Sequence, residues 1–291
     1  MSMKPCYQLL VVLVVTLALL GAAQASDEIR LIVRGDDIGS SHAANIGCIE
    51  SYKSGIMRSV EVMVPCAWFE EAVAMLNANP GLDAGIHLTL TSEWEKIKWR
   101  PLTHGPSLTD ANGYFYPTTR EWDKWPAGTG FYDANPKLAE VEAELRAQIE
   151  LALERINNVS HVTCHMGTAR CRKDLAAMVD RLTKEYGLEV DLASHNIKSA
   201  RGMGDSKASP EDRAQALAQT LEKLTPGLWL FVEHPSKDFP EMRAIGHKGY
   251  EHVANDREGV TQAFTSDQVK EVIKRRKIKL MSYGDFRKKA N

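Results

Sequence analysis

The chain has 291 residues and a formal net charge of −2, and 25% of its residues are charged. This near balance provides neither a basic footprint for nucleic acid nor a polybasic patch for a membrane surface, so we expect neither partner. The sequence also shows no internal repeat or low-complexity tract, so we expect a single globular core.

The first 25 residues have the pattern of a signal peptide. Lys4 supplies a positive charge, residues 9–20 are apolar, and the run 23–25 (Ala-Gln-Ala) is a small-x-small cleavage signal. The alternative is a membrane anchor, but the apolar run is shorter than the roughly 20 residues that span a bilayer. We therefore expect an exported protein, periplasmic or extracellular, whose mature part (residues 26–291) forms one domain without a membrane span.

Short β-branched runs alternate with helical periodicity along the mature part. The predicted strands are 29–33, 59–64, 83–90, 161–165, 189–192, 228–233 and 279–281. The predicted helices are 42–53, 67–77, 138–156, 172–185, 210–224 and 266–276. Such alternation favours a parallel sheet with helical crossovers, and seven strands over this length predict an irregular (β/α) barrel of TIM-like type.

A long insertion after the third predicted strand interrupts this rhythm. Residues 93–135 are rich in aromatic residues, proline and glycine, and Trp94 stands at their start. A loop of this length beside a catalytic-looking strand indicates a cover over the substrate, with rings such as Trp94 stacking on it. The alternative, that the rings only pack the insertion onto the barrel, stays open.

Two adjacent acids, Asp36 and Asp37, follow the first predicted strand. Neighbouring carboxylates resist ionising together unless a cation or a proton relieves their repulsion. His87 and His165 come at or near the ends of two later strands, where barrel enzymes place their chemistry. Because one carboxylate and two imidazoles can hold a divalent metal ion and leave positions open, the set predicts a metal-dependent hydrolase.

The metal and the proton-transfer groups stay open at this point. Zn²⁺, Mg²⁺, Mn²⁺ and Fe²⁺ all suit such ligands. The second aspartate is placed to take a proton from water, and His234, which closes another predicted strand before a proline, is the predicted proton donor to the leaving group. Glu233 is its rival for that role.

Four segments together resemble the YdjC-like carbohydrate deacetylases, the family of chitooligosaccharide deacetylase. They are Asp36-Asp37-Ile38-Gly39, Gly85-Ile86-His87-Leu88-Thr89-Leu90, the strand from His161 to Gly167, and His234-Pro235-Ser236. Arg257, expected just before a polar helix, is similar to a late arginine of the family. The resemblance extends over residues 29–286.

The resemblance implies an irregular (β/α) barrel that removes acetyl groups from an N-acetylated mono- or oligosaccharide. It implies one divalent ion, Mg²⁺ or Zn²⁺, held by Asp37, His87 and His165, with Asp36 as the base and Arg257 at the substrate. The roles of the two aspartates could be exchanged.

Two positions depart from the family pattern. Thr163 stands where the family has an aspartate, so we expect any support that this carboxylate gives a metal ligand to be missing. Gly167 stands where a further histidine is common, which leaves room for Arg170 or Arg172 to meet an anionic substrate. Both arginines can equally be surface charges.

A rival hypothesis is a non-catalytic saccharide-binding barrel that lost its activity with the altered Thr163 strand. The intact Asp36, Asp37 and His87 favour the enzyme, because a binding protein has no need of an adjacent acid pair. The four cysteines of the mature part permit disulfides between Cys48 and Cys66 and between Cys164 and Cys171, and the sequence leaves both open.

Overall fold

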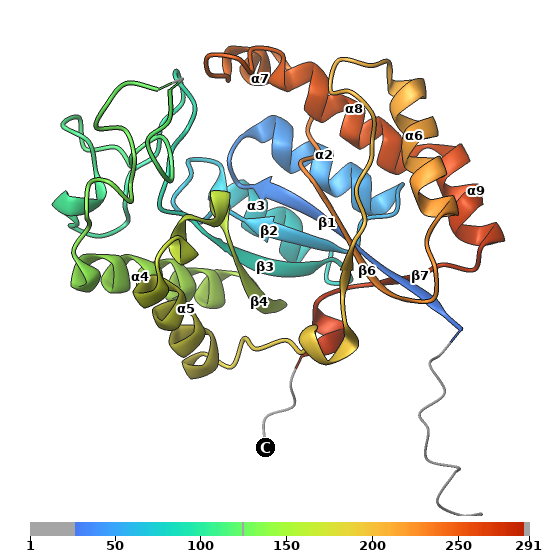
Figure 1. The fold of residues 1–291 in the computed structure, drawn as a ribbon, viewed down its shortest axis with the longest axis horizontal. Helices are drawn as coiled ribbons and strands as arrows, with labels where there is room; N and C mark the ends of the chain where they lie inside the picture. The colour runs from blue at the N-terminus through green and yellow to red at the C-terminus, as the bar shows by residue number, and fades with distance from the viewer. Residues whose placement is uncertain (1–26, 124, 288–291) are drawn as a thin grey trace, which may run out of the picture.

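The computed structural model describes residues 27–123 and 125–287. They form an α/β fold around a seven-stranded sheet in which all strand pairs are parallel (Figure 1). The strands are β1 (Ile29–Ile38), β2 (Ser59–Val62), β3 (Asp83–Leu88), β4 (Val159–Cys164), β5 (Lys198–Ser199), β6 (Gly227–Glu233) and β7 (Lys279–Met281). The predicted class, parallel pairing and strand number are thus confirmed.

The sheet does not close into a barrel. Its order is β4-β3-β2-β1-β6-β5, with β7 beside β1, and within the described residues no pairing joins β4 to β5. The predicted irregular, TIM-like barrel is therefore present as a half-barrel that does not close. A physical reason is the edge strand β5, which has only two residues, both exposed, and offers too short a ladder for closure.

The predicted strand 189–192 is wrong. Val190 forms only an isolated bridge with Arg287, and β5 comes several residues later. Val190 and Leu192 instead pack around a small apolar cluster that includes Ile32 and Leu228. Their apolar pattern is thus satisfied by side-chain packing without a sheet ladder, and sequence periodicity does not separate these two outcomes.

Helices connect the strands and cover one face of the sheet (Figure 1). They are α2 (His42–Lys53), α3 (Phe69–Asn77), α4 (Leu138–Arg155), α5 (Lys173–Glu185), α6 (Pro210–Glu222), α7 (Pro240–Ala244), α8 (Val253–Thr265) and α9 (Asp267–Arg275). Ser41 caps α2 by accepting a hydrogen bond from the amide of Ala44, as Ser209 caps α6. The helices α7 and α8 were not predicted, although the spacing of Val253, Val260 and Phe264 follows a buried helical face.

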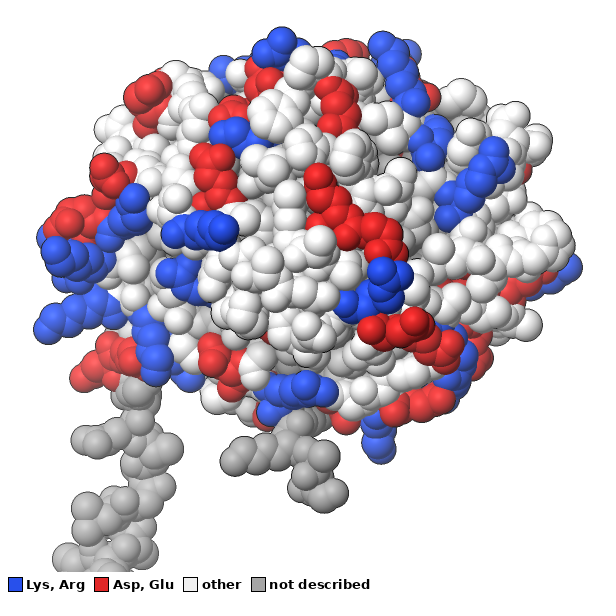
Figure 2. Space-filling model, turned by 180° about the vertical axis from the view of Figure 1, so that it is seen from behind, with Lys and Arg blue, Asp and Glu red and all other residues white. Residues whose placement is uncertain are grey.

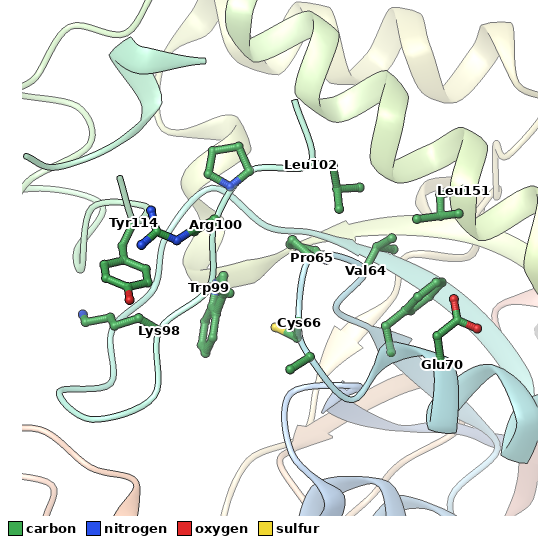
Figure 3. Close-up of a pocket in the computed structure, with 13 residues that line it drawn as sticks. Val64, Pro65, Cys66, Glu70, Lys98, Trp99, Arg100, Leu102, Tyr114 and Leu151 are labelled. Atoms are coloured by element: carbon green, nitrogen blue, oxygen red, sulfur yellow. The ribbon is translucent and has the colours of Figure 1, made fainter. Parts of the chain in front are cut away.

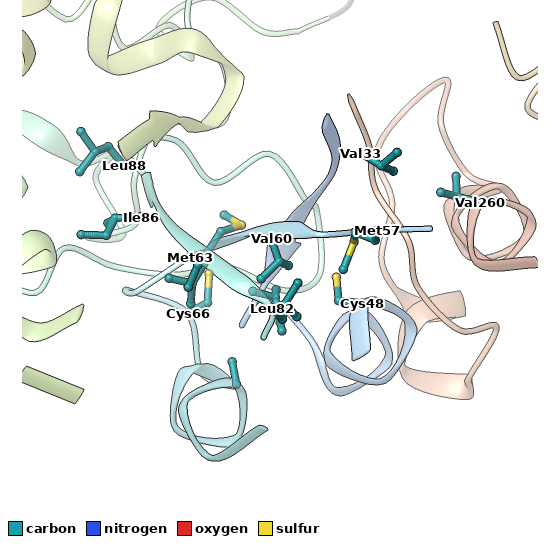
Figure 4. Close-up of a cluster of buried hydrophobic side chains, with 14 of the residues drawn as sticks. Val33, Cys48, Met57, Val60, Met63, Cys66, Leu82, Ile86, Leu88 and Val260 are labelled. Atoms are coloured by element: carbon teal, nitrogen blue, oxygen red, sulfur yellow. The ribbon is translucent and has the colours of Figure 1, made fainter. Parts of the chain in front are cut away.

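Strand alternation gives the sheet one apolar and one polar face. Val33, Val60 and Ile86 point into the main apolar core, which Figure 4 draws together with Cys48 of α2 and Leu82. Polar residues at alternate positions of β1, β2, β3 and β4 form the polar face. They are Arg34, Asp36, Ser59, Glu61, Asp83, His87, His161 and Thr163. The polar side of strand 161–165 thus belongs to a larger polar surface inside the half-barrel.

The segment between β3 and α4 lies to the left in Figure 1 and, in its described residues, contains one short 3₁₀ helix, η1 (Pro106–Leu108). The side chains of Trp94, Trp99, Phe115 and Phe131 are buried. These four rings therefore pack the segment onto the rest of the fold. Trp122 is exposed, and a covering role over substrate stays a prediction.

The surface mixes both signs of charge. On the face in Figure 2, basic and acidic side chains are interspersed, in keeping with the small net charge. No helix in the described ranges is long and apolar enough to cross a membrane. The predicted signal peptide (residues 1–25) lies outside the described residues. The four mature-part cysteines, Cys48, Cys66, Cys164 and Cys171, all have free thiols.

Candidate metal centre

The structure brings together the three predicted metal ligands. One ligand atom each from Asp37, His87 and His165 lies within 4.8 Å of the others, and all three side chains are buried. Asp37 Oδ1 is 3.6 Å from His87 Nε2 and 3.3 Å from His165 Nδ1. One oxygen and two nitrogens thus surround a single point at the C-terminal ends of the strands.

A bulge at the end of β1 turns both aspartates toward this point. Neighbouring strand residues normally face opposite sides of a sheet, but the register with β2 shifts between Gly35 and Ile38, and Asp37 has φ 74°. Aspartate tolerates this left-handed conformation better than most residues. As a result Asp36 Oδ2 also comes within 3.8 Å of His87 Nε2.

The hydrogen bonds of Asp37 occupy one carboxylate oxygen and leave the other for a cation. Arg257 Nη1 donates to Asp37 Oδ2 over 2.9 Å, whereas buried Oδ1 makes no hydrogen bond with the described part of the chain. Burial favours the neutral acid, but the charge of Arg257, followed by interactions with His234 and His165, outweighs it and holds the pKa of Asp37 well below its usual range. An ionised oxygen that lies 3.3 Å and 3.6 Å from two imidazole nitrogens fits a divalent cation.

Each histidine uses one ring nitrogen for a protein partner and presents the other to the centre. His165 Nε2 lies 3.0 Å from Glu93 Oε2, and His87 Nδ1 lies 2.7 Å from Thr163 Oγ1. Such partners are typical of metal-ligating histidines, because they hold the ring and its tautomer. Glu93 was not among the predicted site residues; its signal was that it is the first acid after the uncharged run 88–92 that follows His87.

The expectation that Thr163 leaves a ligand without support is wrong. Its hydroxyl contacts His87 and also donates to Glu61 Oε2 over 2.5 Å. Glu61 is fully buried in β2. The Glu61 carboxylate is therefore connected to His87 through the Thr163 hydroxyl. Glu61 comes from β2, a strand that carries none of the four motifs of the resemblance.

Asp36 has the environment of a base. Burial raises its pKa to about 7, against the opposing charge of Arg34, which donates to its two oxygens over 2.7 and 2.9 Å. A carboxylate of this pKa accepts protons efficiently near neutral pH. It lies next to the metal ligands without itself belonging to the group of three.

The two candidate proton donors at the end of β6 differ in surroundings. His234 feels the charges of Asp37, Arg257 and His165, and burial lowers its pKa to about 4. Burial raises the pKa of Glu233 to about 7, and its charge interacts with Arg213, Asp256 and Arg257. His234 is thus the one coupled electrostatically to the metal ligands.

Of the predicted substrate residues, Arg257 contacts the candidate metal centre, whereas Arg170 forms an ion pair on α5. Arg257 contacts Asp37 from within α8, not from before a helix as expected, and its guanidinium carbon lies 5.1 Å from the ring centroid of Trp94. Trp94 is only 4% exposed. Arg170 pairs with Asp180 and Arg172 with Asp174, both on α5, so neither is directed by an ion pair toward the metal ligands.

Gly167 borders open space. A side chain there would meet no atom within 4 Å, and Met166 and Gly167 both have positive φ. The predicted space beside Gly167 is therefore present, but neither Arg170 nor Arg172 lies within 4 Å of it.

A cavity of about 590 Å³ has Trp99 in its wall, and its lining includes none of Asp37, His87 and His165 (Figure 3). Its lining includes Cys66, Arg100, Tyr114 and Trp99, and the ring centroid of Trp99 is 6.2 Å from that of His165. One aromatic side chain therefore contributes to the cavity wall and to the surroundings of a candidate ligand.

The sequence of the chain matches a known protein family. The family model described as YdjC-like protein matches residues 30–275. A carbohydrate deacetylase of Thermus thermophilus is 32% identical over 241 residues, 74% of this chain and 80% of that protein. A carbohydrate deacetylase of Brevibacillus brevis is 26% identical over 282 residues, 88% of this chain and 99% of that protein.

A solved structure supports the fold. The "putative cellobiose-phosphate cleavage protein" of Enterococcus faecalis is 23% identical and superposes with a TM-score of 0.69, over 90% of this chain and all of that one. Such a likeness supports the half-barrel architecture alone. With the family model matching most of the sequence, the chain belongs to the YdjC-like protein family.

Proposed function

We propose that the protein is a metal-dependent hydrolase that removes acetyl groups from an N-acetylated mono- or oligosaccharide. The observation that carries the proposal is the buried group of Asp37, His87 and His165, in which Asp37 Oδ1 has no hydrogen-bond partner among the described residues. Relatives named carbohydrate deacetylase in Thermus thermophilus and Brevibacillus brevis support the reaction class.

One divalent cation, Mg²⁺ or Zn²⁺, belongs to the proposal, with Asp37, His87 and His165 as its ligands. Two imidazole nitrogens and one carboxylate favour Zn²⁺, since Mg²⁺ prefers oxygen ligands. When bound, such an ion polarises a carbonyl group and acidifies water. Glu93 and Thr163 hold the two rings so that one nitrogen of each faces the cation position.

The chain's own groups then move the protons. Asp36, with a pKa of about 7, accepts a proton from the attacking water. His234 delivers a proton to the departing nitrogen. Because burial lowers the pKa of His234 to about 4, this side chain is neutral at pH 7. The proton that it passes on is the one that Asp36 has taken from water, so one proton leaves the water and one reaches the amine.

Residues of α8 and of the segment after β3 belong to the proposed substrate site. We assign Arg257 to the site because it contacts Asp37, and Trp94 to the backing of Arg257 because its ring is buried. Arg170, paired with Asp180, would have to leave that acid to reach an anionic sugar.

The test measures metal content and acetate release together. Purified protein is loaded with Zn²⁺ or Mg²⁺, and acetate is assayed against a panel of N-acetylated mono- and oligosaccharides. We expect one bound ion per chain and acetate release that stops when a chelator removes the ion. Sugar binding without metal or acetate would support the non-catalytic saccharide-binding protein instead.

We also propose that the protein is exported through a cleaved leader. The basis is the sequence of residues 1–25 alone. Expression of the full chain in a bacterial host with N-terminal sequencing of the mature protein tests it. We expect the sequence to begin at Ser26, and a product that keeps its first residues would contradict export by cleavage.

A further inference from the structure

A chain of hydrogen bonds runs from His87 to a carboxylate on the polar face of the sheet. His87 Nδ1 lies 2.7 Å from Thr163 Oγ1, and Thr163 Oγ1 donates to Glu61 Oε2 over 2.5 Å. The three residues come from the adjacent strands β3, β4 and β2. We call His87, Thr163 and Glu61 the hydroxyl relay.

The direction of these bonds follows from counting hydrogens. Burial opposes ionisation of Glu61, but His161 and the charge of Arg34 more than offset it and lower its pKa to about 2. An ionised carboxylate only accepts, so the single hydroxyl proton of Thr163 goes to Glu61. Toward His87 the hydroxyl oxygen must then accept, which places a hydrogen on Nδ1 and the lone pair of a neutral imidazole on Nε2.

That lone pair is directed at the candidate metal position. His87 Nε2 is the ring atom near the acid pair, 3.6 Å from Asp37 Oδ1 and 3.8 Å from Asp36 Oδ2. Without the relay, the ring could equally carry its hydrogen on Nε2 and donate it to an aspartate. The relay therefore selects the tautomer that binds a cation.

Glu61 is itself held rigidly. Its other oxygen, Oε1, lies 2.7 Å from His161 Nε2, and the His161 ring stacks on Tyr283 with centroids 4.1 Å apart. Gly85 of β3 lies against this pair: a Cβ at that position would overlap Glu61 Oε2 and His161 Nε2. The fold thus keeps space for the carboxylate directly beneath the strand that carries His87.

We propose that Glu61 and Thr163 are positioning residues that fix the tautomer and orientation of His87 and thereby set the affinity of the site for its cation. The inference rests on the metal site of the proposed function. His165 provides the internal comparison, since Glu93 reaches its ring directly. In this protein one ligand has a direct carboxylate partner and the other has a carboxylate partner through a hydroxyl.

The main experiment measures Zn²⁺ affinity of the folded chain by competition with a chromogenic chelator. Thr163→Val keeps the shape but removes the hydroxyl, and we expect binding to weaken about 10- to 100-fold, the usual effect of losing a partner behind a ligand. Thr163→Ser keeps the hydroxyl and should stay close to the native affinity. Thr183→Val is the matched control, because the Thr183 hydroxyl on α5 is buried without a hydrogen-bond partner among the described residues.

A second pair of variants moves the carboxylate. Glu61→Gln removes the charge with little change in size and should weaken Zn²⁺ binding. Thr163→Asp combined with Glu61→Gln restores a carboxylate in direct reach of His87, so we expect the double variant to bind more tightly than Glu61→Gln alone. A double variant no better than the single one would overturn the carboxylate's part in the relay.

A measurement on the metal-free native protein needs no substitution. Nitrogen-15 chemical shifts should show His87 neutral with its hydrogen on Nδ1, and that preference should be lost in Thr163→Val. A hydrogen on Nε2 in the native protein contradicts the relay. If native protein binds Zn²⁺ tightly and Thr163→Val binds equally well, the relay alone is wrong; if native protein binds no divalent cation, the proposed metal site falls with it.

Discussion

Arg257 Nη1 and Asp37 Oδ2 form a buried hydrogen bond of 2.9 Å between the second turn of α8 and the end of β1. The bond occupies one carboxylate oxygen and leaves Oδ1 toward His87 and His165. An ionised side chain with one oxygen tied and one free is suited to monodentate binding of a cation. This geometry supports the proposed ligand role of Asp37 and the proposed base role of Asp36.

Asp37→Asn should abolish tight metal binding. Asparagine also tolerates the left-handed backbone found at this position, so the variant removes the charge without adding strain. We expect Zn²⁺ affinity to fall by more than the roughly 10- to 100-fold typical of residues behind a ligand. Equilibrium dialysis with metal analysis measures it.

Asp36→Asn is the paired test and should behave in the opposite way. It keeps the three ligands, so metal content should stay close to native, while acetate release should fall about 10²- to 10⁴-fold with the loss of a general base. If Asp36→Asn loses the metal and Asp37→Asn retains it, the two roles are exchanged.

Glu93→Gln should weaken metal binding through His165. The Glu93 carboxylate lies 3.0 Å from His165 Nε2, and a neutral amide holds the ring less firmly and makes it less basic. We expect a loss of about 10- to 100-fold in Zn²⁺ affinity. Glu95→Gln is the control, since Glu95 accepts a hydrogen bond from the exposed backbone amide of Lys248, and its affinity should equal that of native protein.

Gly85→Ala should cost both stability and metal affinity. Its added methyl group overlaps Glu61 and His161, two fully buried side chains that hold each other and have no space to move. Overpacking of this kind typically destabilises by about 1–3 kcal/mol, measured by denaturant unfolding. Gly81→Ala meets only the hydroxyl end of the partly buried Tyr52 and should be milder. Equal losses in the two variants would argue against the steric account.

The stability of the metal-free protein should fall in acid partly because of Glu61. Its pKa of about 2 in the folded protein lies below the ordinary value of 4.5, so the ionised form stabilises the fold above about pH 4.5. That stabilisation is lost as the pH falls from about 4.5 toward 2. Unfolding free energies of native protein and Glu61→Gln should converge over this range, and parallel pH profiles would contradict the assignment.

The sequence by itself determined the elements that depend on local pattern. Alternating apolar residues predicted six of the seven strands, Ser41 and Ser209 marked two helix starts, and the polar ends of β1, β3 and β4 predicted the metal ligands. These signals are local because capping bonds and strand alternation involve residues only a few positions apart. The same patterns on three parallel strands also implied that Asp37, His87 and His165 share one end of the sheet.

Only the tertiary structure decided how the site is completed. The bulge that turns Asp37 beside Asp36 depends on register with β2, and the partners of the ligands, Glu61, Glu93 and Arg257, come from positions that no motif connects to them. The open edge of the half-barrel likewise depends on the length of β5. Hydrogen bonds between residues distant in the chain are set by packing of whole elements, and that packing leaves no local pattern in the sequence from which to infer it.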